Sequence, residues 1–185
     1  MTRAFLVIIL VAFWALLVYA MYRGWRRRAR NQGAILGDLP TCPEDLGPPV
    51  LPVTTGVYVG STMAPNWQDR ITVGDLGFRA TAALSRHGRG ILLERNGSEP
   101  MWIPDESIVE IRTDRRLAGK VMSRDGLLVI RWRPGGGPDP ATEIDTGFRG
   151  DDKNIYPRWV ATEQQLHGGS ADKSGTTDQN REAGQ

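Results

Sequence analysis

The side chains most often used for catalysis and metal binding are sparse in this sequence. Two histidines, His87 and His167, and one cysteine, Cys42, are the only residues of their types. Zinc sites combine such side chains at short spacings, and neither histidine has a second histidine or a cysteine at ligand spacing. A single cysteine also excludes a disulfide within the chain. We therefore expect no metal or other cofactor, and we interpret both histidines as solvated surface residues.

Catalysis by nucleophiles or by paired acids has no stronger basis. A nucleophile needs an activating base beside it. Ser85 lies two residues before His87, but this spacing crosses into a predicted turn and does not indicate a nucleophile–base pair. Glu143 and Asp145 lie two residues apart on one face of a predicted strand. We interpret them as a solvated pair, the alternative being an acid–base pair. We predict that the chain is not an enzyme.

A glycine run, Gly135 to Gly137, is the stretch that we compare with a phosphate-binding loop. It lacks the Lys-Ser or Lys-Thr that follows the glycines in such loops, and it lies between two predicted strands. We predict a hairpin loop.

One polar cluster stands out from the rest of the chain. Five bases surround a single predicted strand–loop–strand connection, and only Asp114 and Asp125 accompany them. The bases are Arg112, Arg115, Arg116, Lys120 and Arg124. The cluster suits a phosphate group or an acidic partner, and the alternative is a solvated loop.

All these residues follow an apolar N-terminal segment. Residues 4–22 are 19 residues without a charge, which as a helix rising ~1.5 Å per residue would span a bilayer. Arginines follow at once, and basic residues beside a span stay in the cytoplasm. We therefore predict a single-pass cell-membrane protein with its N-terminus outside and residues 31–185 in the cytoplasm. The alternative, a cleaved secretory signal, is disfavoured by the five arginines beyond the candidate cleavage site.

The charge of the chain is divided between the anchor and the remainder. Six of the 23 basic residues and none of the 21 acidic residues lie in residues 1–30, so residues 31–185 carry 17 bases against 21 acids, a net of −4. This balance argues against a nucleic-acid partner. The bases near the membrane are candidates for contact with anionic lipid, although a topology signal alone explains them equally well. They are Arg26, Arg27, Arg28 and Arg30.

The chain divides into four parts. Residues 1–30 form the anchor with its arginine-rich flank, and residues 31–49, rich in proline and glycine, form a linker. Residues 50–167 form one domain. Residues 168–185 lack any large apolar side chain and are predicted to be disordered.

Short alternating runs, separated by turn signals every 8–12 residues or so, predict an antiparallel β-sandwich or barrel of about seven strands. Asn96-Gly97 predicts a type I′ hairpin turn. A helix is predicted from Pro157 through Leu166, ending at Gly168-Gly169. The alternating runs are 57–59, 71–73, 78–84, 91–93, 101–103, 108–111, 128–133 and 144–148.

The ordered set of motifs resembles a known family. The step Ile103-Pro104 to Ile108 is similar to the I-P-x-x-x-I step of bacterial PH-like domains. The wider chain, over roughly residues 1–166, resembles actinobacterial single-span membrane proteins with a PH-like domain, often labelled export- or transporter-related. Further matching stretches are Gly56–Gly60, Trp67–Arg70, Gly74–Ala80 and Glu143–Phe148.

The resemblance implies seven antiparallel strands in a strongly bent sandwich with a C-terminal helix, and no catalytic residues. The loop Gly60–Asn66 has no base, so no residue for inositol-lipid binding is carried over. We expect a membrane-anchored interaction or scaffold module that binds a protein or peptide. The alternatives are an accessory subunit of an export or transport system and an anionic-lipid-binding module.

Overall fold

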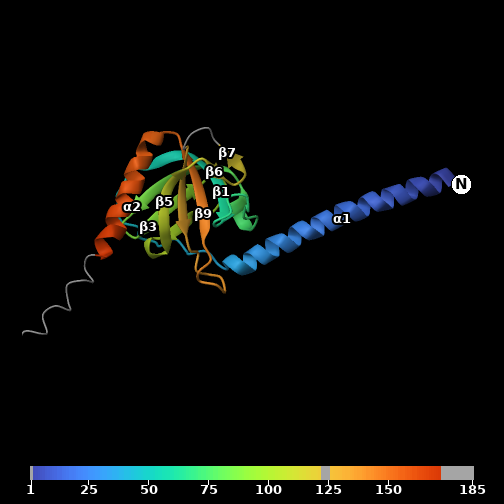
Figure 1. The fold of residues 1–185 in the computed structure, drawn as a ribbon, viewed down its shortest axis with the longest axis horizontal. Helices are drawn as coiled ribbons and strands as arrows, with labels where there is room; N and C mark the ends of the chain where they lie inside the picture. The colour runs from blue at the N-terminus through green and yellow to red at the C-terminus, as the bar shows by residue number, and fades with distance from the viewer. Residues whose placement is uncertain (1, 122–125, 172–185) are drawn as a thin grey trace, which may run out of the picture.

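A computed structural model describes residues 2–121 and 126–171. A long N-terminal helix, α1 (Thr2–Leu36), precedes a curled β-sheet, and a second helix, α2 (Tyr156–Ala171), lies on the opposite side of the domain (Figure 1). The described residues also form three short 3₁₀ helices: η1 (Gly74–Gly77) and η2 (Asp105–Ser107) between strands, and η3 (Lys153–Ile155) before α2. The strands are β1 (Thr54–Met63), β2 (Ala80–His87), β3 (Gly90–Arg95), β4 (Met101–Pro104), β5 (Ile108–Asp114), β6 (Arg116–Leu117), β7 (Lys120–Val121), β8 (Leu127–Trp132) and β9 (Ile144–Gly150).

Seven of these strands form one antiparallel sheet in the order β4-β3-β2-β1-β9-β8-β5. Strand β1 joins the two halves, because Thr54–Tyr58 pair with β2 and Gly56–Met63 pair with β9. The register of β1 on β9 shifts between Tyr58 and Gly60. Such a bulge bends and twists a strand, which helps the sheet to curl around one core. The predicted antiparallel β-fold with its C-terminal helix is confirmed.

The curled sheet encloses a core dominated by aromatic and branched side chains. Trp132 of β8 and Trp159 of α2 are each at most 1% exposed. Large aromatic side chains contribute most to a core of this kind, and Trp159 is the residue through which α2 closes the sheet. Other fully buried members include Tyr58, Leu84, Ile91, Ile103, Ile130, Ile144 and Phe148.

A short hairpin that the sequence did not predict, β6–β7, packs outside this core. The side chain of Leu117 is fully buried, and a Cβ added to Gly147 of β9 would lie 2.1 Å from its Cδ2 atom. The missing side chain at Gly147 therefore gives Leu117 its place against the sheet. The hairpin completes a second apolar cluster, made of Val59, Leu117, Ala118, Leu127 and Val129.

Three local predictions were wrong. The predicted strand around Ile71 and Val73 is a loop that leads into η1. Ile71 is buried, and Val73, which packs against the main core, also lies beside Gly33 of α1. Asn96 does not adopt the positive φ that a type I′ turn needs, although Gly97 does at +80°. Helix α2 continues to Ala171 and does not stop at Gly168.

The last turn of α1 is held by the domain. Gln32 is only 7% exposed; its Oε1 atom accepts hydrogen bonds from the backbone N–H and the hydroxyl of Thr72, both at 2.8 Å. Its Nε2 atom donates to the carbonyl of Arg70 at 3.3 Å. Leu36 enters the main core and is 2% exposed. The segment predicted as the beginning of a linker is thus helical and packed as far as Leu36.

Backbone packs directly on backbone where α1 ends. Gly37 has a φ of +63° and forms a parallel bridge with Gly136 in the β8–β9 loop. A Cβ at Gly136 would lie 2.1 Å from the carbonyl oxygen of Asp38, and one at Gly137 would lie 1.8 Å from that of Ile35. Real Cβ atoms do not approach so closely, so the glycine run is the surface that receives the end of α1.

Asp145 is buried and Glu143 is only partly so, contrary to the prediction of a solvated pair. Asp145 is 1% exposed and accepts hydrogen bonds from Arg131 Nε at 2.8 Å and Arg112 Nη2 at 2.8 Å. Burial opposes ionisation of Asp145, but the hydrogen bonds from Arg131 and Arg112 outweigh it, so the pKa of Asp145 lies below its ordinary value. Glu143 remains near the surface and pairs with Arg133 at 2.7 Å.

Replacing Gly136 with alanine should separate the end of α1 from the domain. The added methyl group collides with backbone, which cannot rotate away as a side chain can. We expect a loss of stability on the order of 2 kcal/mol and faster hydrogen exchange at residues 32–37 and 70–73, measured by mass spectrometry. Gly88→Ala is the control, because a Cβ there meets nothing within 4 Å. Unchanged exchange in Gly136→Ala would contradict the packing.

Asp145→Asn should destabilise the domain and reduce its sensitivity to acid. The loss at neutral pH should be about 2 kcal/mol, below the ~3–5 kcal/mol of a fully buried pair, because Arg112 and Arg131 reach solvent. The pKa of Asp145 is lower in the folded than in the unfolded state. Its contribution is therefore complete above the unfolded pKa of ~3.9 and is lost as the pH falls through the folded pKa.

The measurement is urea unfolding followed by tryptophan fluorescence at pH 7 and below pH 4. The wild-type chain should lose more stability between these conditions than Asp145→Asn does. Glu94→Gln, which changes an exposed acid on β3, is the control and should behave as wild type. An Asp145→Asn variant with the wild-type acid dependence would show that another carboxyl group is responsible.

Candidate functional site

The basic residues proposed as ligand contacts are only partly described, and those that are described have different surroundings. Arg112 points to Asp145, as described above. Arg115 and Arg116 are exposed at the start of the β6–β7 hairpin, where both backbone N–H groups donate to the Asp114 carboxylate, at 2.6 and 3.1 Å. The backbone of Lys120 lies on β7, but its side chain, like the whole of Arg124, lies outside the described residues.

The arginines of the anchor are only partly described. Arg26 is exposed on α1, and its guanidinium lies 5.2 Å from the centre of the Tyr22 ring. The side chains of Arg27, Arg28 and Arg30 lie outside the described part of the chain.

His87 is buried, which corrects its interpretation as a solvated residue. It is 7% exposed; its Nδ1 atom lies 3.0 Å from the carbonyl oxygen of Gly47, and its Nε2 atom lies 3.1 Å from Ser85 Oγ. With the proton on Nδ1, the ring donates to Gly47 and accepts from Ser85. Neither side chain lines the cavity described below, so the pair holds the segment before β1 against β2. The side chain of His167 lies outside the described residues.

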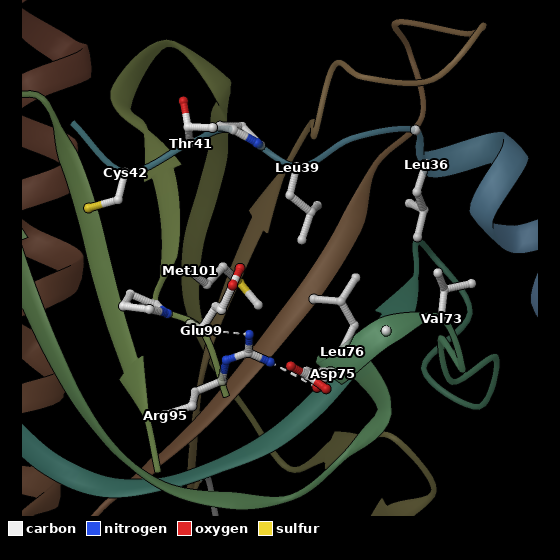
Figure 2. Close-up of a pocket in the computed structure, with 14 residues that line it drawn as sticks. Leu36, Leu39, Thr41, Cys42, Val73, Asp75, Leu76, Arg95, Glu99 and Met101 are labelled. Carbon is white, nitrogen blue, oxygen red and sulfur yellow. Dashed lines mark hydrogen bonds between the residues drawn. The ribbon is translucent and has the colours of Figure 1, made fainter. Parts of the chain in front are cut away.

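A cavity of about 500 Å³ opens beside the end of α1. Figure 2 shows that its walls come from three places: the segment after α1, the η1 turn and the β3–β4 loop. Leu39 and Leu76 point toward each other from opposite sides. The cavity is therefore composite, because the segment that carries the anchor supplies one wall and the domain supplies the others. Its apolar lining is Leu36, Leu39, Pro40, Val73, Leu76, Pro100 and Met101.

Arg95 holds two of the cavity's walls together. Its side chain is buried, and it donates from Nη1 to the carbonyl of Asp75 at 2.8 Å and from Nη2 to that of Glu99 at 2.9 Å (Figure 2). The guanidinium also lies 5.3 Å from the centre of the Tyr58 ring. The Tyr58 hydroxyl in turn donates to the carbonyl of Leu76 at 2.7 Å. Burial raises the pKa of Tyr58 to about 12, so the hydroxyl remains a donor at neutral pH.

The rim of the cavity is acidic. The side chains of Asp75 and Glu99 are exposed, whereas the only basic side chain among the lining residues, Arg95, already donates to two carbonyl groups. Thr41 and Cys42 add small polar groups at the outer edge. The site therefore combines an apolar interior with a negatively charged entrance. Sequence reasoning missed it, because its lining comes from a predicted linker, a wrongly predicted strand and a turn.

No metal site is found among residues 2–121 and 126–171, where no group of three or more His, Cys, Asp or Glu side chains converges.

Comparison with known proteins identifies the fold. The model of the family described as Bacterial PH domain-like matches residues 36–164, well over half of the chain. No curated protein matches the chain. The match begins at Leu36, the residue through which α1 enters the core, and it contains the curled sheet, every wall of the cavity and most of α2. The chain belongs to the bacterial PH domain-like family.

Proposed function

We propose that this protein is a membrane-anchored, non-catalytic interaction module that binds a segment of a partner protein in the cavity beside α1. The composite cavity is the observation that carries this proposal. Its interior accepts an apolar side chain, and its acidic rim favours a partner with a lysine or arginine next to that side chain. The net charge of −4 on residues 31–185 also favours a basic partner.

The anchor part of the proposal rests on α1. Val7–Gly24 forms one helical segment long and apolar enough to cross a membrane, and none of it is buried against the domain. The arginines that follow support a domain on the cytoplasmic side of the cell membrane. A role beside an export or transport system is supported only by the resemblance described above.

The cavity should bind short peptides that carry a leucine or phenylalanine flanked by lysine or arginine. Fluorescence anisotropy with the full chain in lipid nanodiscs would compare these peptides with matched peptides carrying glutamate flanks. We expect tighter binding of the basic peptides. Glu99→Lys should weaken their binding about tenfold, equivalent to ~1.4 kcal/mol, because it reverses one charge at the rim.

Glu106→Lys is the matched control, since Glu106 is an exposed acid outside the cavity. It should leave the affinity unchanged. A bound peptide should also slow the reaction of Cys42 with a bulky maleimide, because Cys42 lines the cavity. Equal binding of acidic and basic peptides, or equal effects of the two substitutions, would contradict the proposed specificity.

The same cysteine tests the topology. Cys42 is exposed and is the only thiol in the chain. A membrane-impermeant maleimide should therefore label it only after cells are permeabilised. Labelling of intact cells would place the domain outside the membrane and would overturn the proposed location.

A further inference from the structure

We propose that the partner of the cavity is a segment of another membrane protein in the same bilayer, and that α1 sets how far from the bilayer this segment must extend. The inference rests on the proposed function, because it requires both the peptide-binding cavity and the anchor. The partner is selected by the position of its basic residues along its chain as well as by their charge.

The end of α1 is part of the cavity. The side chain of Gln32 is hydrogen-bonded to Thr72 and to the carbonyl of Arg70, and Leu36 is buried in the main core. Leu36 also lines the cavity. Figure 1 shows the helix running without interruption away from the domain. A continuous helix that is packed at its end holds the cavity at a set distance from the membrane, which a flexible linker would not do.

That distance follows from the length of the helix. The candidate span ends at Gly24, and α1 continues to Leu36. The helical residues from Trp25 to Leu36 add about 18 Å at ~1.5 Å per residue. Lipid headgroups fill about the first 5–7 Å, so the cavity opens roughly 11 Å beyond them. A segment that lies flat on the membrane surface therefore does not reach the cavity.

The described charges change sign with distance from the bilayer. The arginine run lies within residues 23–30, next to the span, and Arg23 and Arg26 are exposed. Residues 31–69 contain no base. Exposed acids lie beside the cavity, where the segment after α1 and the rim supply Asp38, Asp75 and Glu99. A basic segment is therefore repelled close to the bilayer and attracted at the level of the cavity.

Basic residues beside an apolar stretch are typical of the cytoplasmic flanks of membrane spans. Under the proposed topology, such flanks share the compartment of the cavity, and their attachment to the same bilayer raises their effective concentration. A second copy of this chain does not supply the ligand from its own arginine run, because the same helix fixes residues 23–30 roughly 9–20 Å closer to the bilayer. The partner is therefore a different membrane protein.

The partner chain must be long enough to reach the cavity from its own span. Packed helices lie ~8–10 Å apart, so a span beside α1 is separated from the cavity by about 20 Å, which takes at least about six extended residues. A flexible chain has a root-mean-square length of ~5–6 Å times the square root of its residue number, so about twelve residues match this distance. We expect no binding with shorter segments and the tightest binding near twelve residues.

Model partners of known length measure this dependence in the full chain. Each is a polyleucine span, a Gly-Ser linker and a leucine flanked by lysines. Linkers of three, seven and twelve residues fall below, just above and well above the limit of about six. The chain and one model partner would share phosphatidylcholine vesicles, and the reaction of Cys42 with a bulky, membrane-impermeant maleimide would be followed. The twelve-residue linker should slow this reaction about tenfold more than the three-residue linker.

Two controls separate charge from distance. A twelve-residue linker that ends in a leucine flanked by glutamates should leave the reaction of Cys42 unchanged. Insertion of seven helix-forming residues after Arg30, about two turns, raises the cavity by about 10 Å and keeps its direction. This variant should be protected by the twelve-residue linker and no longer by the seven-residue linker. A soluble peptide with the same basic motif should protect both chains equally.

Equal protection by the three- and twelve-residue linkers in the wild-type chain would overturn the distance rule. If the soluble basic peptide still protects Cys42, the proposed cavity function stands without that rule. Failure of the soluble peptide to protect the wild-type chain would overturn the cavity function, and this inference with it. An insertion variant that responds to the soluble peptide but keeps the wild-type linker dependence would show that α1 does not set the distance.

Discussion

The end of α1 meets the β8–β9 loop through backbone alone, and the arrangement of the molecule depends on this contact. Gly136 and Gly137 have no side chains to keep the helix away, and Gly37 ends the helix in a conformation that other residues rarely adopt. The contact places Leu36 in the core and the following segment across the cavity. The last turn of α1 is thereby part of the domain, whereas the apolar segment Val7–Gly24 is not buried against it.

This construction couples the anchor to the candidate site. A molecule in the cavity would contact Leu36 and Leu39 on one side and Leu76 and Met101 on the other. Its binding free energy would therefore favour the attached state of α1, and attachment would by the same amount favour binding. A cavity formed wholly within the β-sheet would have no such dependence. The affinity of the cavity for a ligand would thus depend on where α1 enters the domain as well as on the chemistry of the lining.

The sequence predicted the elements that depend on local periodicity. Every strand of the seven-stranded sheet overlaps a predicted run, and α2 follows from its apolar edge and Pro157. The failures share another cause, which is contact between distant segments. Val73 is apolar because it faces α1, and Leu117 is apolar because Gly147 leaves space for it. His87 is buried by a residue forty positions earlier, Gly47. None of these partners can be read from neighbouring residues.

The partners and positions of the charged side chains say more about the candidate site than the number of basic residues does. Arg112 was one of five bases in the sequence cluster, but it donates a hydrogen bond to the buried carboxylate of Asp145. Arg95 is likewise committed to two carbonyl groups, and the exposed charges beside it are acidic. The described charges at the entrance of the cavity are thus acidic, which suits the basic partner segment proposed above.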